Sequence, residues 1–218
     1  MDLQAIIFDF DGVCIDTETA RYQSWQRIFE SYGHELPLGE WVKNIGQAAW
    51  VSHPFDILQH LTGRLLDREA LDALHRVGEI EIANSLPLQP GFADRLREAG
   101  ALSISCAIAS SSSHRWVDGH LERRGLIGQF KAIVCREDTG AHKPDPRPYL
   151  AALERLGVSS ANAVVVEDSP TGIASARAAG LYCIGVPCNL TRDMDLSAAD
   201  RIVKSLEEVS WREMCGSL

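Results

Sequence analysis

The feature that most constrains the fold is an alternation of short apolar segments with longer segments of helical periodicity. Six apolar segments have the length of β-strands, and apolar residues recur every three or four positions between most of them. This alternation is typical of a parallel sheet whose strands are connected by helices. We therefore expect an α/β fold, a parallel sheet core flanked by helices, with strands at residues 5–10, 104–109, 132–135, 163–166, 181–186 and 201–203.

Glycine residues mark the ends of the expected helices. Segments of helical periodicity run up to Gly100, Gly125, Gly157 and Gly180. A glycine just past the last turn of a helix adopts a left-handed conformation without steric cost. We therefore expect one helix to end at each of these four positions.

The stretch between residues 16 and 87 departs from the alternation. It contains no segment with a strand pattern, whereas apolar residues such as Tyr22, Trp25 and Ile28 have helical spacing. A polar turn precedes the stretch and a proline-rich turn follows it. We expect an all-α helical cap, residues 16–87, inserted after the first strand into a core domain formed by residues 1–15 and 88–218.

Charge and cysteine content exclude several classes of partner. The 218 residues include 21 Lys and Arg against 30 Asp and Glu, a net charge of −9, which disfavours binding to nucleic acid. No apolar stretch approaches the roughly 20 residues that span a bilayer, and no targeting pattern stands at the N-terminus, so we expect no membrane partner. The six cysteines form no Cys-x-x-Cys pair, which argues against zinc and for reduced thiols. We expect a cytoplasmic protein that is a monomer or a weak homo-oligomer.

Two carboxylates lie at the end of the first expected strand. Asp9 and Asp11 are two positions apart and share a face of the strand, and Gly12 allows the backbone to turn away from the sheet. Like charges so close repel each other unless a cation binds between them or one carboxylate is protonated. The pair predicts a metal site or an acid–base pair, although an Asp-rich turn that caps the next helix gives the same pattern.

Three further polar segments follow expected strands. Ser110 and Ser111 come after the second strand, Lys143 after the third, and Glu167 and Asp168 after the fourth. Taken singly, these segments are equally typical of a polar loop, a surface lysine and a helix start. The carboxyl ends of the strands in an open parallel sheet form the ligand crevice, so we expect the segments to meet at one edge.

In this combination the sequence resembles the haloacid dehalogenase superfamily of phosphotransferases. The resemblance extends over essentially the whole chain and implies a Rossmann-like core. The helical insertion resembles the cap of the branch that contains beta-phosphoglucomutase and many small-molecule phosphatases. The four signatures of the superfamily match Asp9-x-Asp11-Gly12, Ser110, Lys143-Pro144 and Glu167-Asp168.

The resemblance implies a Mg2+-dependent hydrolase of small phosphorylated metabolites. Asp9 would be the nucleophile that forms an aspartyl-phosphate, and Asp11 the general acid and then the general base. Ser110, Lys143 and Mg2+ would neutralise the charge of the transferred phosphoryl group. The metal would be held by Asp9, Asp11 through its main-chain carbonyl, Glu167 and Asp168, and the phosphate would also contact Gly12, Ser111, Lys143 and the cap residue Gln47.

A phosphosugar mutase is the main alternative. Mutases of this branch have a histidine in the first cap helix and an arginine just past the cap glycine, and the matching positions here hold Arg21 and Ala49. A mutase needs a second anion site, and the missing arginine favours the phosphatase. Arg21 or Lys43 could still take its place.

Other functions are less well matched. Asp11 excludes the dehalogenases, which lack this second acid, and the length and the cap argue against a receiver domain. A phosphonatase needs a cap lysine of lowered pKa, and nothing around Lys43 suggests one. His114 either faces the substrate or only begins a helix, and Trp50 is expected to pack inside the cap.

Overall fold

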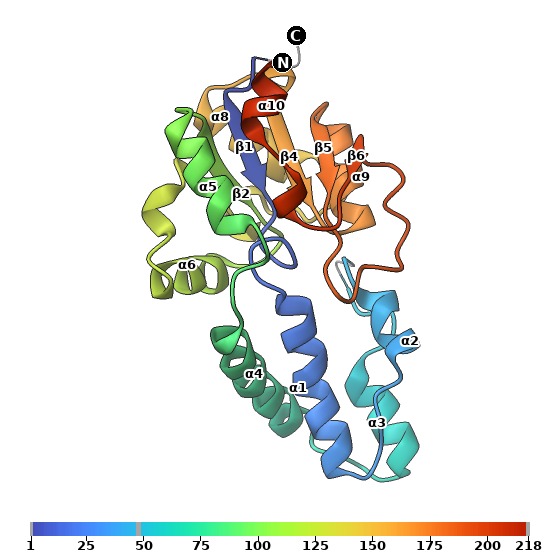
Figure 1. Ribbon diagram of the computed structural model, residues 1–218. Coiled ribbons are helices and arrows are strands. Elements are labelled where there is room, and N and C mark those ends of the chain that lie inside the picture. Colours follow the sequence, from blue (N-terminus) through green and yellow to red (C-terminus); the bar gives the residue numbers. More distant parts are fainter. Residues whose placement is uncertain (1, 47–48, 217–218) are drawn as a thin grey trace.

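The computed structural model describes residues 2–46 and 49–216, and its centre is a sheet of six parallel strands (Figure 1). The strand order is β3-β2-β1-β4-β5-β6, and every neighbouring pair is parallel. The expected α/β fold with a parallel sheet is confirmed. The strands are β1 (Ala5–Phe8), β2 (Ser105–Ala109), β3 (Ala132–Val134), β4 (Ala163–Glu167), β5 (Tyr182–Gly185) and β6 (Arg201–Ile202).

Helices cover both faces of this sheet, which explains why β1 at its centre is apolar and buried at every position. The elements around the sheet are α5 (Phe92–Ala101), α6 (His114–Arg123), η2 (Ile127–Gln129), α7 (Arg136–Thr139), α8 (Arg147–Leu156), η3 (Ser160–Asn162), α9 (Pro170–Ala178), η4 (Leu206–Glu208) and α10 (Trp211–Gly216). Ile6 and Phe8 of β1 belong to a buried cluster with α5, α6 and α10, whereas Ala5 and Ile7 belong to a second cluster with α8 and α9.

Three of the four expected glycine stops are confirmed. Gly125, Gly157 and Gly180 have φ of 66°, 71° and 73° and lie just past the ends of α6, α8 and α9. The fourth expectation is wrong, because α5 continues through Gly100 to Ala101 and the left-handed residue is Ser103, with φ of 59°. A glycine inside an exposed helical turn costs about 1 kcal/mol, which the packing of α5 on the sheet tolerates.

All elements that the structure describes between β1 and α5 are helical, as expected. They are α1 (Thr17–Ser31), α2 (Leu38–Trp41), η1 (Val42–Asn44), α3 (Pro54–Thr62) and α4 (Arg68–Ser85), which extend from one end of the sheet in Figure 1. They enclose their own buried cluster, which includes Trp25, Phe29, Trp41, Phe55 and Leu58. The division of the chain into two domains at residues 15/16 and 87/88 stays a prediction.

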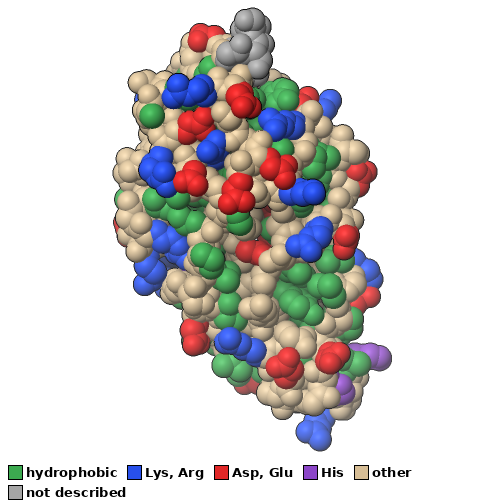
Figure 2. Space-filling model, in the orientation of Figure 1, with side chains coloured by type: hydrophobic (Ala, Val, Ile, Leu, Met, Phe, Trp, Pro, Cys, Tyr) green, Lys and Arg blue, Asp and Glu red, His purple; other side chains and the backbone are tan. Residues whose placement is uncertain are grey.

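The surface charges, the hydropathy of the helices and the state of the cysteines were each the subject of an expectation from the sequence. In Figure 2, acidic and basic side chains are interspersed over the visible face, and its described residues form no continuous basic patch. No helix within the described ranges is long and apolar enough to cross a membrane. All six cysteines are free, and Cys215 is the exposed one among them.

Candidate active site

The predicted site residues converge on a cavity of about 530 Å³ between the carboxyl edge of the sheet and the cap. Of these residues, Gly12 is absent from the cavity wall and lies behind Asp168, and Gln47 lies outside the residues that the structure describes. The predicted residues that line the cavity are Asp9, Asp11, Ser110, Ser111, Lys143, Glu167 and Asp168.

Lys143 connects the first and the fourth predicted segments. Its ammonium group donates hydrogen bonds to Asp9 Oδ1 and, at 2.6 Å, to Glu167 Oε1. The Lys143 side chain is 6% exposed, and its Nζ lies 4.7 Å from the centre of the Tyr149 ring. Burial alone would lower the pKa of Lys143, but the carboxylates of Asp9 and Glu167 outweigh this effect and raise it. The lysine is therefore a fixed positive charge beside Asp9.

Glu167 is enclosed by hydrogen-bond donors. Its side chain is 0% exposed, and Oε1 accepts from the Tyr149 hydroxyl at 2.6 Å as well as from Lys143. Oε2 accepts from the main-chain N–H of Asp168 at 3.0 Å and from the Ser169 hydroxyl at 3.2 Å. A Cβ atom at Gly172 would lie about 2 Å from the Glu167 carboxylate, so this position requires glycine. Both oxygens are thus used in holding Lys143 and the loop after β4.

Asp168 stands against the first loop of the chain. Gly12 has φ of 85°, and a Cβ atom there would lie 2.0 Å from Asp168 Oδ2. Only glycine therefore allows the turn after β1 to approach this carboxylate. On its other side, Asp168 Oδ2 accepts from the Thr191 hydroxyl at 3.5 Å.

The site is a cluster of carboxylates with too few positive charges. Burial raises the pKa of Asp9, and Glu167 and Asp11 raise it further, while Lys143 opposes them. Burial, Glu167 and Asp9 together raise the pKa of Asp168. One ligand oxygen each from Asp9, Glu167 and Asp168 lie within 4.8 Å of one another. These buried hard oxygen donors, with an excess of negative charge, fit a divalent cation such as Mg2+.

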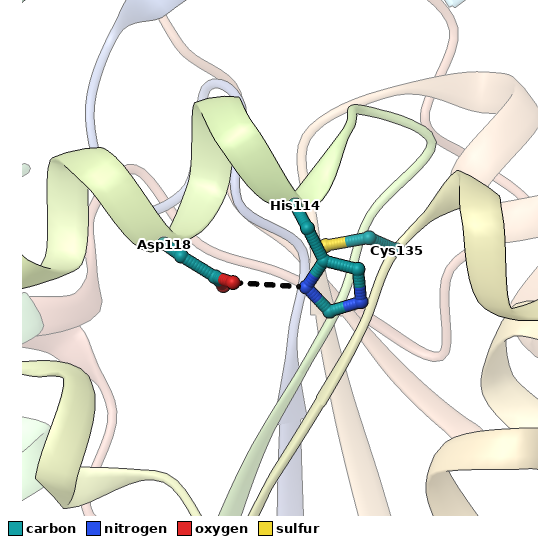
Figure 3. Close-up of side chains that lie close together, drawn as sticks. All are labelled: His114, Asp118 and Cys135. Atoms are coloured by element: carbon teal, nitrogen blue, oxygen red, sulfur yellow. Dashed lines mark hydrogen bonds and ion pairs between the residues drawn. The ribbon is translucent and has the colours of Figure 1, made fainter.

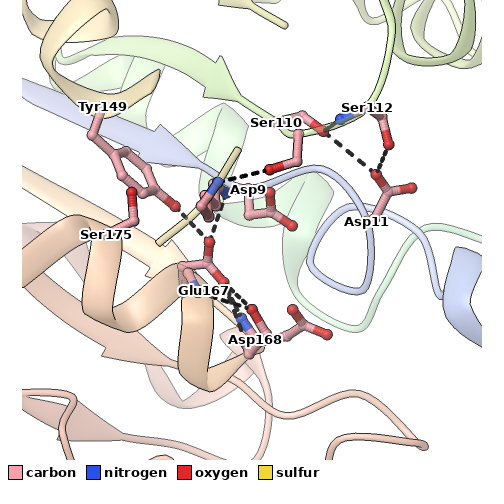
Figure 4. Close-up of polar contacts among 12 residues, drawn as sticks. Asp9, Asp11, Ser110, Ser112, Tyr149, Glu167, Asp168 and Ser175 are labelled. Atoms are coloured by element: carbon pink, nitrogen blue, oxygen red, sulfur yellow. Dashed lines mark hydrogen bonds and ion pairs between the residues drawn. The ribbon is translucent and has the colours of Figure 1, made fainter. Parts of the chain in front are cut away.

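Asp11 is held by a different set of partners. Oδ1 accepts from the Thr17 hydroxyl at 2.6 Å and from the Trp116 indole N–H at 2.8 Å. Oδ2 accepts from the Ser112 hydroxyl at 2.5 Å and from the Ser110 hydroxyl at 3.4 Å. Figure 4 shows the carboxylate turned toward these two serines. All four groups donate, so both oxygens of the Asp11 carboxylate are acceptors in this arrangement.

The serine loop after β2 is ordered by its own hydrogen bonds. Ser110 is 1% exposed, its N–H donates to the Val134 carbonyl, and its hydroxyl accepts from the N–H of Ser112. Ser111 Oγ accepts from the main-chain N–H of Lys143 at 3.3 Å. The two predicted serines therefore lie beside Asp11 and Lys143, as the order of segments along the sheet requires.

The opposite wall of the cavity comes from the cap and carries charges of both signs. Arg21 lies 3.8 Å from both Glu18 and Glu79, and its guanidinium carbon is 5.0 Å from the centre of the Trp50 ring. Burial raises the pKa of Glu79 to about 7. The cap side chains in this wall include Glu18, Arg21, Asn44, Arg76 and Glu79.

Of the residues compared with the mutases, one lines the cavity and the others do not. Ala49 is exposed, and Lys43 pairs with Glu40 at 2.6 Å and is absent from the cavity wall, whereas Arg21 is part of it. Trp50 packs edge-on against Trp41 within the cap, as expected, but it is half-buried and not fully buried.

His114 belongs to an ion-pair network beside the site. It is the first residue of α6, and one ring nitrogen contacts Asp118 at 3.0 Å (Figure 3). The other ring nitrogen contacts Asp138 at 2.7 Å. Burial disfavours the charged ring, but the hydrogen bonds to these carboxylates prevail and raise the pKa of His114. Cys135 also lies near this pair, and one ligand atom each from His114, Asp118 and Cys135 lie within 4.8 Å of one another. His114 does not line the cavity, which favours the simple helix start over contact with substrate.

The sequence did not predict several residues that contact the site. Thr17, Ser112 and Trp116 bind Asp11, and Tyr149 binds Glu167. For Tyr149, helical periodicity already explained an apolar position, so its hydroxyl gave no signal. For Ser112 and Trp116, the only available signal is that they lie in or just after the serine loop.

Comparisons with known proteins agree with this geometry. The family model described as haloacid dehalogenase-like hydrolase matches residues 6–186. A Bacillus subtilis protein named "Putative phosphatase YhcW" is 39% identical over 207 residues, which cover 95% of this chain and 94% of the relative. The validoxylamine A 7'-phosphate phosphatase of Streptomyces hygroscopicus is 28% identical and covers 94% of this chain and 95% of its own.

A solved structure has the same fold over the full length. The crystal structure of a Thermotoga maritima protein described as "putative beta-phosphoglucomutase" has a TM-score of 0.82 and 29% identity, and covers 99% of this chain and 100% of its own. The family model and the relatives identify the same family. The chain belongs to the haloacid dehalogenase-like hydrolase family, as an enzyme of the phosphatase type.

Proposed function

We propose that the protein hydrolyses phosphate monoesters of small metabolites in two steps, through a covalent phosphate on Asp9. The observation that carries the proposal is the contact of Asp9 with Lys143, deep in a cavity that also holds Asp11 and Asp168. A buried carboxylate beside a fixed positive charge can approach an anionic phosphate with less repulsion. The family and its phosphatases support the same reaction.

In the first step, an oxygen of Asp9 attacks phosphorus, the ester bond breaks, and Asp11 gives a proton to the leaving oxygen. In the second step, a water molecule attacks the same phosphorus and Asp11 takes its proton. The bond between phosphorus and the Asp9 oxygen breaks, which releases inorganic phosphate and restores the Asp9 carboxylate. Ser110 and Ser111 line the cavity, Ser111 in contact with Lys143, and both would bind the phosphoryl oxygens.

Asp9, Asp168 and the Asp11 carbonyl would hold Mg2+. Bound there, Mg2+ would offset the excess negative charge of the site and that of the phosphoryl group. Glu167 was also expected among the metal ligands, but the hydrogen bonds at both of its oxygens favour a role as the anchor of Lys143.

The leaving group would contact the cap wall. Arg21, Arg76 and Glu79 offer polar and charged contacts there, which suit a hydroxylated, water-soluble metabolite. The absence of nucleic-acid and membrane partners, a cytoplasmic location, and a monomeric or weakly associated state stay predictions.

The mutase alternative keeps one supporting observation. Arg21 and Arg76 bring two guanidinium groups to the cap wall, where a second phosphate could bind even though position 49 is alanine. Incubation with beta-glucose 1-phosphate and a trace of the 1,6-bisphosphate separates the two functions. We expect free phosphate to appear, whereas rapid formation of glucose 6-phosphate with little free phosphate would favour the mutase.

A panel of phosphate monoesters tests the proposed function itself. Purified protein is assayed for phosphate release with Mg2+, with Ca2+ and with excess chelator. We expect release with Mg2+, poor release with Ca2+ because of its larger and looser coordination, and none with chelator. Full activity in excess chelator would overturn the metal-dependent reaction.

A further inference from the structure

Trp116 lies where the core, the cap and Asp11 meet. It stands in the first turn of α6, where its main-chain N–H donates to Ser113 Oγ at 3.4 Å. Its indole N–H donates to Asp11 Oδ1 at 2.8 Å, and the residue lines the cavity. The indole therefore contacts the carboxylate that we assign as acid and base, although the indole itself is neither an acid nor a base at neutral pH.

The hydrogen bonds of Asp11 come from separate elements. Thr17 begins the first helix of the cap, Ser112 lies in the loop after β2, and Trp116 belongs to α6. Oδ1 is shared between Thr17 from the cap and Trp116 from the core. The place of the carboxylate therefore depends on how the cap sits relative to α6.

One face of α6 extends the contact between the core and the cap as far as the end of α4. Trp116, His120 and Arg124 are spaced four residues apart, so they lie on one side of the helix and its C-cap. The Trp116 and His120 rings are edge-to-face at 4.4 Å. Arg124 donates to the carbonyls of Ala83 at 2.9 Å and Leu86 at 3.0 Å, where α4 ends and the cap returns to the core. Both carbonyls belong to the end of α4, the Ala83 carbonyl to its last turn and the Leu86 carbonyl to its C-cap.

Apolar packing joins the same two parts. Trp116 packs against the cap residues Ala20, Ile82 and Ala83, and also against the main cluster of the core. Leu86 is the other half-buried residue that packs against both clusters. A movement of α1 or α4 relative to the core must therefore displace the indole or slide past it.

We propose that Trp116 is a positioning residue, which places the Asp11 carboxylate according to the position of the cap. The inference rests on the proposed role of Asp11. In the first step Asp11 must reach the leaving oxygen, and in the second it must reach the attacking water, so both transfers suffer when its anchor is lost. Trp116 itself neither gives nor takes a proton, and Asp9 has no contact that depends on it.

The test separates steps that use Asp11 from the step that does not. Trp116→Phe removes the N–H and keeps an aromatic ring. Rapid-quench kinetics with Mg2+ would use 4-nitrophenyl phosphate, whose leaving group needs no proton, and glucose 6-phosphate, whose leaving group does. We expect the phosphoenzyme to form from 4-nitrophenyl phosphate within about twofold of the wild-type rate, and to decay about tenfold more slowly. Turnover of glucose 6-phosphate should fall about tenfold with little change in KM.

Trp211→Phe is the matched control. Trp211 is fully buried and its indole N–H donates to the Arg95 carbonyl at 3.0 Å, away from the cavity. This variant loses the same kind of hydrogen bond. Below its unfolding temperature, we expect wild-type rates of phosphoenzyme formation, of phosphoenzyme decay and of glucose 6-phosphate turnover. Equal slowing of phosphoenzyme formation and decay in Trp116→Phe, or unchanged rates throughout, would overturn the positioning role.

A second measurement does not need Trp116→Phe to fold or the enzyme to form a phosphoenzyme. The indole N–H resonance of Trp116 is compared by NMR between wild type and Asp11→Ala. We expect an upfield shift of this resonance as its acceptor is removed, and an unshifted resonance would overturn the contact in solution. If wild type forms no phosphoenzyme, the proposed function fails while this spectrum still decides whether Trp116 holds Asp11.

Discussion

The two walls of the cavity are built in different ways. On the core wall, Glu167, Asp168 and Lys143 are 0%, 3% and 6% exposed, and each has defined hydrogen-bond partners. On the cap wall, Arg76 is exposed, and the ion pairs of Arg21 with Glu18 and Glu79 are both long, at 3.8 Å. Buried partners impose one arrangement, whereas solvated charges can rearrange around different ligands. We propose that the core wall carries out phosphoryl transfer and that the cap wall selects the leaving group.

The largest effect should come from the centre of the core wall. Asp9→Asn keeps the shape of the side chain but cannot form a stable acyl-phosphate, so turnover should fall more than about a thousandfold. Far-ultraviolet circular dichroism and the unfolding temperature should stay close to wild type. Asp94→Asn, on the exposed side of α5, is the control and should keep full activity. Substantial turnover by Asp9→Asn would remove the nucleophile from the account.

A smaller loss is expected from the anchor of Lys143. Glu167→Gln leaves the buried ammonium with Asp9 as its only carboxylate partner, so we expect about 3 kcal/mol less stability and a tenfold or greater loss of turnover, on the order of other broken buried pairs. Tyr149→Phe is the matched variant, because it removes only the hydroxyl that donates to Glu167. It should cost about 1 kcal/mol and leave turnover nearly unchanged. Urea unfolding and steady-state kinetics provide the two readouts, and equal losses in both variants would contradict a charge-anchoring role.

A change on the cap wall should alter selection more than rate. Arg76 lines the cavity and has no ion-pair partner within the described part of the chain. Arg76→Ala should raise KM for a metabolite ester such as glucose 6-phosphate about fivefold, as expected for the loss of one polar contact, with kcat little changed. The KM for the small, activated ester acetyl phosphate should change less. A fall in kcat with KM unchanged would place Arg76 with the chemistry and erase the distinction between the walls.

The last effect concerns the stability of the cap in acid and leaves the two walls unchanged. Burial, reinforced by Arg21, lowers the pKa of His75 from its ordinary 6.5 to about 3, and the ring stacks on Trp25 at 4.8 Å. Between these pH values the unfolded chain binds a proton that the folded cap does not, so stability falls as pH falls from 6.5 toward 3. Each unit of pKa difference corresponds to about 1.4 kcal/mol. Urea unfolding at pH 7 and pH 4.5 should show a smaller acid loss for His75→Phe than for wild type, and an identical loss would exclude His75 as its cause.

The sheet and the four polar segments could be predicted because their signals are local. The apolar run before Asp9 and the one before Glu167 each identify a buried strand, and a parallel sheet brings the residues after its strands to one edge. The loop glycine Gly12 was recognised for the same reason, and the structure adds that Asp168 leaves no room for a side chain there. Such positions follow from strand pattern and topology alone.

The partners of these residues could not be predicted because they are set by tertiary packing. Trp116 reaches Asp11 across 105 positions of the sequence, and Tyr149 reaches Glu167 from a helix whose periodicity already accounted for it. Gly100 failed as a helix stop because the local signal does not include the packing that extends α5 by one more residue. The cap wall has no motif at all, since its residues meet only when α1 and α4 pack together.

The most direct test of the division between the walls is to trap the phosphate on the core. Asp11→Asn can accept a phosphoryl group from 4-nitrophenyl phosphate, whose leaving group needs no acid, but cannot activate water to release it. We predict that intact-mass measurement of this variant with Mg2+ shows one added phosphoryl group, and that the added mass is absent from the double variant Asp9→Asn with Asp11→Asn. An Asp11→Asn protein that still releases phosphate yet never carries the added mass would contradict the covalent route through Asp9.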